Sequence, residues 1–247
     1  MRVALITGGA GAVGSSTARM LAQDGFSLVL ADLDGDRAAS VAEEIRASGA
    51  DAVALGLDIA TPDAAAKLIG CVADRFGRLD CLVNNAGRTG ATRIDALDPD
   101  EWEAVLRVNL TAPMLICREA VPLMRANGGS IVNVASRVYL SGTGVGYTSS
   151  KSGLIGLTRT LAVQLGPHGI RVNAVAPSFL NSPFNTKSVA QNTGLADAFR
   201  RITPLGRVGT ADDVAGAIAF LASDRASFIT GDVLHVCGGA QLAPQPA

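Results

Sequence analysis

The stretch "LITGGAGAVG", residues 5–14, sets a cluster of glycines directly behind a short apolar segment. That segment, "RVALIT" at 2–7, is mostly apolar, which is typical of a strand buried on both faces. Gly9, Gly11 and Gly14 fit the pattern G-x-G-x-x-G between this strand and a helical segment. Such a loop lets the backbone and a helix N-terminus approach a pyrophosphate, so an adenosine-containing ligand is expected here.

An acidic residue follows the next apolar segment, residues 27–31. Asp32 stands 18 residues after Gly14, where a carboxylate can accept hydrogen bonds from both ribose hydroxyls of an adenosine. The glycines and Asp32 do not by themselves separate an NAD-binding protein from another adenosine-binding domain. A methyltransferase that uses S-adenosylmethionine stays open at this point.

Short apolar segments alternate with helical patterns along the whole chain, and this alternation predicts parallel βαβ units. The expected fold class is α/β: a single-domain doubly wound (Rossmann) parallel sheet of about seven strands with helices on both faces. The expected strands are residues 2–7, 27–31, 52–57, 79–87, 130–136, 170–177 and 232–239. The expected helices follow the glycine loop and cover residues 36–49, 61–77, 98–128, 146–167 and 210–224.

Capping residues and prolines add detail to these helices. Thr61 is expected as the N-cap of the helix at 61–77, with a proline in its first turn. The long helix at 98–128 is expected to bend near Pro113 or Pro122. Residues 1–240 are expected to form one catalytic domain in which about 178–200 serve as a substrate lid, followed by a short tail at 241–247.

The composition excludes several classes of function. The 247 residues are 48% hydrophobic and carry a formal net charge of −1 without a basic cluster, so neither nucleic acid nor a membrane is an expected partner. No apolar run is long enough for a signal peptide or a membrane span. The four cysteines form no C-x-x-C pair and the two histidines, His168 and His235, have no metal-ligand spacing. Reduced thiols, a cytoplasmic location and no bound metal are expected.

Tyr147 and Lys151 lie four residues apart in "YTSSK", which places both side chains on one face of a helix. Ser136 ends an expected strand, and "NNAG" at 84–87 ends the strand before it. At this point the sequence resembles the short-chain dehydrogenase/reductase family, from about residue 3 to residue 240. The motifs that carry the resemblance are "TGGAGAVG" at 7–14, Asp32, "LD" at 57–58, "NNAG", "VNL" at 108–110, Ser136, Tyr147 with Lys151, "NAVAP" at 173–177, "PLGRVG" at 204–209 and "FLASDRASFITG" at 220–231.

The resemblance implies a nicotinamide cofactor and a different register for the glycine loop. Gly8, position 12 and Gly14 take the family's glycine positions, while Gly9 and Gly11 become incidental small residues. The implied cofactor-binding residues are Gly8, Ala12, Val13, Gly14, Asp32, Leu33, Asp58, Ile59, Asn84, Asn85, Ala86, Gly87, Tyr147, Lys151, Pro177, Leu180 and Ser182. Three residues depart from the family pattern, namely Ala12, Ser178 and Cys237.

Cofactor choice depends on Asp32. Its carboxylate suits the ribose hydroxyls of NAD and repels the extra phosphate of NADP, and no Arg or Lys stands among residues 8–14. Arg37 is the one residue that could soften this preference. NAD is therefore the expected cofactor.

The family's reaction is hydride transfer between nicotinamide and an alcohol or carbonyl carbon. By the resemblance, Tyr147 exchanges the proton of the substrate oxygen, and the Lys151 ammonium favours the phenolate and bonds the nicotinamide ribose. Ser136 donates a hydrogen bond to the substrate oxygen, and Asn109 holds a water in the proton relay behind the lysine.

The substrate is expected to be a secondary alcohol or a ketone. Candidate pocket residues are Val138, Tyr139, Leu140, Phe179 and Phe184, and Arg88 and Arg137 could pair with an anionic substrate although both are expected to be exposed. The resemblance also implies a homotetramer formed through 98–128, 146–167 and the last helix and strand. Two alternatives stay open: an NADPH-dependent ketoacyl-carrier reductase, and a catalytically silent nucleotide-sensing member of the fold.

Overall fold

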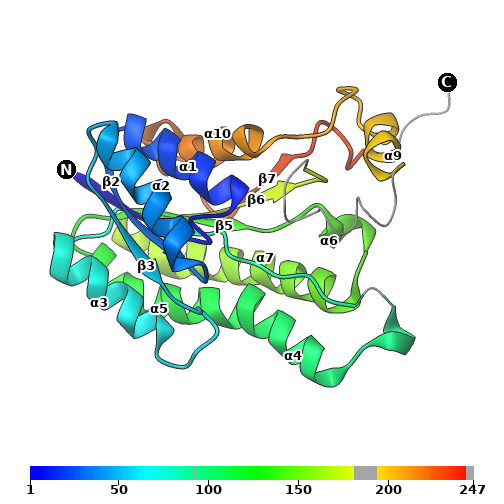
Figure 1. Ribbon diagram of the computed structural model, residues 1–247, viewed down its shortest axis with the longest axis horizontal. Coiled ribbons are helices and arrows are strands. Elements are labelled where there is room, and N and C mark those ends of the chain that lie inside the picture. The colour runs from blue at the N-terminus through cyan, green and yellow to red at the C-terminus, as the bar shows by residue number, and fades with distance from the viewer. Residues whose placement is uncertain (92, 181–193, 243–247) are drawn as a thin grey trace.

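A computed structural model describes residues 1–91, 93–180 and 194–242 (Figure 1). Its centre is a seven-stranded parallel sheet in the order β3-β2-β1-β4-β5-β6-β7. The strands are β1 (Arg2–Thr7), β2 (Phe26–Asp32), β3 (Ala52–Gly56), β4 (Cys81–Asn84), β5 (Gly129–Val134), β6 (Ile170–Pro177) and β7 (Val233–Val236). The order reverses between β1 and β4, and ligands of such sheets bind at the carboxyl ends of the strands at this reversal. The α/β doubly wound class is confirmed.

Helices cover both faces of the sheet (Figure 1). One face packs against α1 (Ala12–Gln23), α2 (Gly35–Ala47) and α10 (Ala211–Ala222), and the other against α3 (Ala64–Phe76), α5 (Ala112–Met124) and α7 (Val145–Leu165). Shorter helices are α4 (Pro99–Leu106), α6 (Val138–Ser141) and α9 (Leu195–Ile202), and single 3-10 turns occupy Ile94–Ala96, Gly166–His168 and Asp224–Ala226. None of the helices in the described ranges combines the length and the apolar character needed to cross a membrane.

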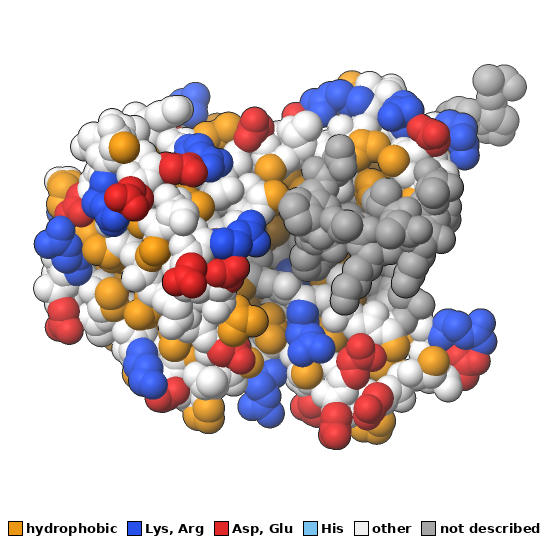
Figure 2. All heavy atoms as spheres, in the orientation of Figure 1, with side chains coloured by type: hydrophobic (Ala, Val, Ile, Leu, Met, Phe, Trp, Pro, Cys, Tyr) orange, Lys and Arg blue, Asp and Glu red, His pale blue; other side chains and the backbone are white. Residues whose placement is uncertain are grey.

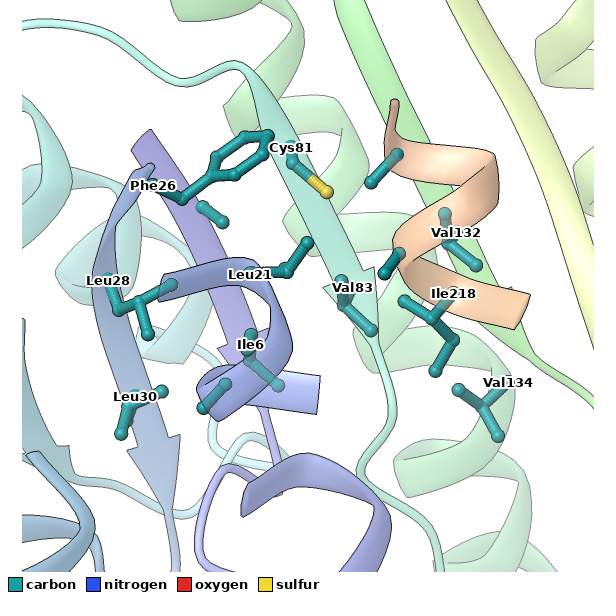
Figure 3. Packing of buried hydrophobic residues seen from close by; sticks show 14 of the residues in the cluster. Ile6, Leu21, Phe26, Leu28, Leu30, Cys81, Val83, Val132, Val134 and Ile218 are labelled. Atoms are coloured by element: carbon teal, nitrogen blue, oxygen red, sulfur yellow. The ribbon is translucent and has the colours of Figure 1, made fainter. Parts of the chain in front are cut away.

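The face covered by α1 and α10 shows how the core positions the glycine loop (Figure 3). Ile6 of β1, Leu28 of β2 and Val83 of β4 are fully buried, and Leu21 of α1 packs over them beside Ile218 of α10. Burying a side chain of this size stabilises the fold by about 1.5–3 kcal/mol. The start of α1 is thereby held against the carboxyl end of β1.

Two expected boundaries were wrong. Thr61 does not cap α3: the helix begins at Ala64 with Asp63 as its N-cap. The Thr61 hydroxyl instead donates to the Asp58 carbonyl at 3.1 Å, in a turn that precedes the helix. The strand expected at 79–87 is shorter, because only Cys81–Asn84 pair with β1 and β5.

The long helix expected at 98–128 is interrupted by a π-helical turn at Arg107–Thr111, between α4 and α5. Pro113, the second residue of α5, has no N–H to offer the carbonyl of Asn109 four residues earlier, which is a physical reason for the irregular turn. Pro122 lies inside α5 without ending it. The irregular turn thus lies beside Pro113, one of the two prolines expected to bend the helix, and its π-helical form was not predicted.

The region expected to form a substrate lid is described only in part. Residues 181–193 lie outside the described residues, as do 243–247 of the expected tail. Leu195–Ile202, within and just beyond the expected lid, form α9, a helix that the sequence reading missed. The function of 178–200 as a lid stays a prediction.

Candidate active site

The glycine loop between β1 and α1 leaves no room for side chains at two positions. Gly8 has a φ of +65°, and a Cβ there would lie 2.9 Å from the Asn85 Nδ2 atom. A Cβ on Gly14 would lie 2.0 Å from the Gly8 carbonyl oxygen. Gly9 is also confined, since its Cβ would come within 3.0 Å of the Leu30 Cβ, so it is not merely incidental.

Ala12, the departure from the family pattern, is the first residue of α1, and every described residue with a positive φ is a glycine. Its methyl group is therefore accommodated in a helical conformation without strain. Gly11 is the N-cap and supplies no side-chain hydrogen bond to the first turn, which also contains no acidic residue. The amide donors and the positive partial charge of this helix start suit a pyrophosphate.

Asp32 and Arg37 both bind Ala10 of the glycine loop, through the two peptide groups on either side of it. The Asp32 carboxylate accepts the Ala10 N–H at 2.9 Å and the Asp34 N–H at 3.1 Å. The Arg37 guanidinium donates to the Ala10 carbonyl at 3.1 Å. Leu33, between them in sequence, is 77% exposed and offers an apolar surface at this end of the site. A carboxylate and a guanidinium are thus both anchored to Ala10, near the expected position of the adenosine ribose.

The loop after β4 is tied to the end of β1. The Thr7 hydroxyl accepts the N–H groups of Asn85 and Ala86 at 3.1 Å each. The Asn85 amide donates to the carbonyls of Thr7 and Gly8 at 3.0 Å. Asn84 can offer only its backbone to a cofactor, as expected for this loop, because its side chain is 2% exposed and donates to Asn133 Oδ1 at 2.8 Å inside the core.

The remaining expected cofactor residues are distributed around the same edge of the sheet. Asp58 is exposed, Ile59 is buried, and Val13 and Gly87 are partly buried. Pro177 is buried at the end of β6. The Leu180 side chain packs into the core, so a contact of this residue with nicotinamide would come from its backbone. Ser182 and Phe184 lie outside the described residues.

The structure brings Ser136, Tyr147 and Lys151 together. Ser136 lies just beyond β5, and the other two occupy the first turns of α7, where a spacing of four residues gives them one face. The Ser136 hydroxyl lies close enough to the Tyr147 phenol to lower its pKa. The Lys151 Nζ atom donates to the Val134 carbonyl at 2.7 Å and lies 5.7 Å from the centre of the Tyr147 ring.

Burial controls the ionisation of this pair. It lowers the pKa of Lys151 from its ordinary value to about 8. It raises the pKa of Tyr147 above its ordinary value, against the hydrogen bond from Ser136, which lowers it. The lowering of the Tyr147 pKa expected from the sequence is absent in the protein alone, because desolvation is the larger effect. A bound oxidised nicotinamide supplies the hydride acceptor and an additional positive charge.

Asn109, in the π-helical turn, is 1% exposed and uses its side chain fully. Its Oδ1 accepts the Arg88 N–H at 2.9 Å, and its Nδ2 donates to the Arg88 carbonyl at 2.9 Å and to the Ser150 hydroxyl at 3.0 Å. Ser150 in turn donates to the Tyr147 carbonyl at 2.8 Å. The side chain therefore fixes the loop after "NNAG" and the start of α7, and a relay water would be held by the Asn109 carbonyl.

Ser150 was missed by the sequence analysis. It is fully buried between the two expected catalytic residues of α7, whereas the neighbouring Ser149 and Ser152 are exposed. Its position three residues after Tyr147 permits the helical side-chain bond to that carbonyl. That spacing was the available signal.

The expected pocket residues have different environments in the structure. Val138, Tyr139 and Leu140 belong to α6, directly after Ser136, and Leu140 is 54% exposed. The Tyr139 hydroxyl is hydrogen-bonded to His235 Nε2 at 2.9 Å, so His235 is more than a packing residue of β7. Phe179 stacks on Phe199 of α9 with ring centres 4.6 Å apart.

The two candidate arginines differ in exposure. Arg88 is exposed, as expected, and its backbone is held by Asn109. Arg137 is not exposed but half-buried, which contradicts the expectation. Cys237 is buried and contacts the Gln241 side chain.

Three features of this site are typical of a nicotinamide-dependent oxidoreductase. They are the tight glycine turn where the strand order reverses, the acidic residue at the end of the next strand, and the buried lysine beside a tyrosine. The model of the family described as enoyl-(acyl carrier protein) reductase matches residues 8–241. The chain belongs to the short-chain dehydrogenase/reductase family.

Three relatives show the range of activities in this family. The chain is 38% identical to the BbsD subunit of (2S)-[(R)-hydroxy(phenyl)methyl]succinyl-CoA dehydrogenase of Thauera aromatica, over 98% of this chain and 97% of that protein. It is 39% identical to trans-4-hydroxycyclohexanecarboxylate dehydrogenase of Sinomonas cyclohexanicum, over 96% and 92%. It is 37% identical to the 3-oxoacyl-[acyl-carrier-protein] reductase FabG of Thermotoga maritima, over 96% and 97%.

Solved structures agree with this assignment. Levodione reductase superposes with a TM-score of 0.92 at 32% identity, over 97% of both chains. A protein from Beutenbergia cavernae assigned as an NAD(P)-dependent gluconate 5-dehydrogenase, with NADP bound at low occupancy, gives a TM-score of 0.90 at 35% identity over 97% of this chain and 96% of that one. The chain is therefore an oxidoreductase whose relatives include alcohol dehydrogenases and ketoacyl reductases.

Proposed function

We propose that the protein transfers a hydride between NAD(H) and a secondary alcohol or ketone, with Ser136, Tyr147, Lys151 and Asn109 as its catalytic tetrad. The observation that carries this proposal is the grouping of Ser136, Tyr147 and the buried Lys151, whose ammonium lies 5.7 Å from the centre of the phenol ring. A scaffold or nucleotide sensor without catalysis has no need of this arrangement, since burying an ammonium is costly.

In this mechanism the substrate oxygen lies between the two hydroxyls. Ser136 donates a hydrogen bond to that oxygen, and Tyr147 takes its proton during oxidation or returns it during reduction. Lys151 stabilises the phenolate, and the proton released during oxidation passes to solvent through a water held at the Asn109 carbonyl. Asn109 and Ser150 hold the start of α7 in place through the hydrogen bonds described above.

The preference for NAD rests on Asp32. Two like charges about 4 Å apart repel by roughly 1 kcal/mol in bulk water and by roughly 4 kcal/mol at an effective dielectric constant near 20. Even the lower figure approaches the ~1.4 kcal/mol of a tenfold preference. Arg37 works against this preference, because its guanidinium donates to the carbonyl of Ala10, the residue whose N–H binds Asp32, and could pair with a 2′-phosphate.

The test of cofactor choice compares kcat/KM for NAD and NADP in the wild type and in Asp32→Ser and Arg37→Ala. We expect the wild type to prefer NAD by at least about tenfold. Asp32→Ser should shrink the ratio by admitting NADP, and Arg37→Ala should widen it. Equal use of both cofactors by the wild type, or an unchanged ratio in Asp32→Ser, would show that Asp32 is not the selector.

The substrate class can be narrowed by a screen of alcohols and ketones followed at the NADH absorbance band. The relatives named above act on hydroxylated carboxylic acids and thioesters, so cyclic and aryl hydroxy acids come first in the screen. An NADPH-dependent 3-oxoacyl-carrier reductase is the second candidate. The FabG relatives and the approach of Arg37 to the adenosine end favour it.

We also propose that the protein works as a cytoplasmic homotetramer without a nucleic-acid or membrane partner. On the face seen in Figure 2, acidic and basic side chains are interspersed, and no large patch of one sign is visible. A nucleic-acid surface would instead gather Lys and Arg on one face.

A further inference from the structure

Arg137 lies between two residues of the proposed site. It follows Ser136 directly, and its backbone N–H donates to the Pro177 carbonyl at 2.8 Å, which links the carboxyl ends of β5 and β6. Its side chain extends toward the turn after β7, where Nη1 donates to the Ala240 carbonyl at 3.3 Å. The guanidinium therefore lies at the edge of the sheet that carries the reaction.

Within the described ranges, no acidic side chain pairs with the positive charge of Arg137. Its side-chain hydrogen bond to Ala240 is long and goes to a neutral carbonyl, and its Nε atom is buried without a partner among the described residues. The ion pairs within the described ranges do not include Arg137. Leaving a buried donor without an acceptor is costly, and more so when the donor is charged.

The geometry of the guanidinium restricts what could satisfy it. Nη1 donates to Ala240, whereas Nε has no partner among the described residues. In a planar guanidinium the N–H of Nε is parallel to one N–H of Nη2, and this fork matches the two oxygens of a carboxylate in a strong, bidentate hydrogen bond. The Ala240 carbonyl takes neither donor of the fork and leaves the positive charge without an anion.

We propose that Arg137 binds a carboxylate of the substrate, away from the carbon that exchanges hydride. The inference rests on the proposed dehydrogenase function and makes it more specific: the substrates are hydroxy or oxo carboxylic acids. Ser136 then holds the reacting oxygen while Arg137, the next residue, holds the acid group. Arg137 thereby acts as a specificity-determining residue and takes no part in proton transfer.

The test measures binding to the NADH-loaded protein by isothermal titration calorimetry. The probes are a panel of cyclohexane, aryl and aliphatic hydroxy acids, including trans-4-hydroxycyclohexanecarboxylate, each paired with its uncharged carboxamide of the same shape. At least one acid is expected to bind about tenfold or more tightly than its amide, which is the scale of a charge-assisted hydrogen bond. Arg137→Gln should bring that ratio close to one, and Arg137→Lys should keep part of it.

Two further variants make the result specific. Arg159→Gln removes an exposed charge of α7 and should leave the ratio unchanged. Arg88→Gln tests the exposed neighbour, and a loss of selectivity there instead of in Arg137→Gln would overturn the assignment. Thermal melting of each variant separates loss of binding from loss of folding, and Arg137→Lys keeps the test informative if the Gln variant is unstable.

The proposal is wrong if no acid of the panel binds better than its amide, or if Arg137→Gln keeps the full preference. Its failure can be told apart from a failure of the proposed function. Absence of NADH formation with every alcohol would refute the dehydrogenase function, while the calorimetric ratio reports on Arg137 alone.

Discussion

Lys151 is the charged side chain that the described part of the fold buries most completely, at 3% exposure. It lies in the second turn of α7, near the ring of Tyr147, and its ammonium donates a hydrogen bond to the Val134 carbonyl. A buried ammonium lowers the stability of the folded protein, so its presence needs a reason other than folding. Proton transfer through Tyr147 is such a reason.

Replacement of Lys151 by Met is expected to stabilise the fold while abolishing turnover. Burial lowers the pKa of Lys151 to about 8, so the folded protein holds this proton less tightly than the unfolded chain does. The gain is expected to be on the order of 1–3 kcal/mol at pH 7, and it should shrink as the pH rises from about 8 through the pKa of unfolded lysine, about 10.4. Thermal melting at pH 7 and pH 10 measures it.

Lys67 supplies the matched control. It is an exposed lysine of α3 that pairs with Asp63, so Lys67→Met removes a charge without relieving burial. We expect a change within about 0.5 kcal/mol for this variant. A melting temperature of Lys151→Met at or below that of the wild type at pH 7 would contradict the account of the buried charge.

Tyr147→Phe removes the hydroxyl that exchanges the proton and changes little else. Turnover is expected to fall by a factor on the order of 10² or more, the scale of positioned acid–base catalysis. NADH should still bind, because the glycine loop and Asp32 are untouched, and this is measured by fluorescence titration. Near-normal turnover in the purified variant would remove Tyr147 from the mechanism.

At the scale of elements, the β1–α1 unit and the interrupted helix do most to shape the site. The close approach of Gly14 to the Gly8 carbonyl makes the turn into α1 tight, and the π-helical turn at Arg107–Thr111 directs the Asn109 side chain toward α7. Both features are local irregularities held by a well-packed core. Irregular helical turns of this kind are frequent at functional sites.

Gly14→Ala is expected to destabilise the protein and weaken NADH binding. The added Cβ would stand 2.0 Å from the Gly8 carbonyl oxygen, so the turn has to open. Overpacking of this kind costs about 1–3 kcal/mol, and an opened turn moves the amide donors of α1 away from the pyrophosphate. Melting temperature and NADH affinity are measured together.

The control is Gly216→Ala in α10, where a Cβ would meet nothing within 4 Å. A glycine inside a helix costs about 0.5–1 kcal/mol relative to alanine, so this variant should be slightly more stable than the wild type. If both variants behave alike, the tight turn is not what requires Gly14.

The sequence predicted the strands and most helices because each buried segment has a continuous apolar run or a clear helical period. The sequence did not predict the exact start of α3 or the shortest helices. Asp63 is the N-cap of α3 in place of Thr61, and α6 and α9 have too few turns to show a helical period. The grouping of Ser136, Tyr147 and Lys151 followed from their order in the chain, whereas the partners of Arg137 and His235 are set by contacts over about a hundred residues.

At the scale of the whole molecule, some apolar side chains are exposed on the outer faces of the helices that cover the sheet. Val163 of α7 is 78% exposed and Met114 of α5 is 39% exposed. Single exposed apolar residues are ordinary, but these lie on the two helices through which the family is expected to assemble. A helix pair of this kind can bury its apolar stripe against the same pair of a second copy.

The expected assembly is a homotetramer with two-fold interfaces. Static light scattering at micromolar concentration should give four times the mass of the 25.1 kDa chain. Val163→Glu should weaken the contact through α7 and yield dimers, because a charge would be buried in the interface. A monomeric wild type, or a tetramer indifferent to Val163→Glu, would count against this mode of assembly.

The seven strands all run in one direction, so their carboxyl ends lie together at one edge of the sheet. The loops that follow these ends can differ between relatives while the sheet itself is kept. We expect the substrate to be selected by α6, with Arg137 at its N-cap, and by the described residues that follow β6, because these segments follow the carboxyl ends of β5 and β6. We expect that substrate selectivity can be changed by grafting these segments from a relative of different selectivity. The glycine loop and the Tyr147–Lys151 pair would stay unchanged, because other segments of the chain hold them.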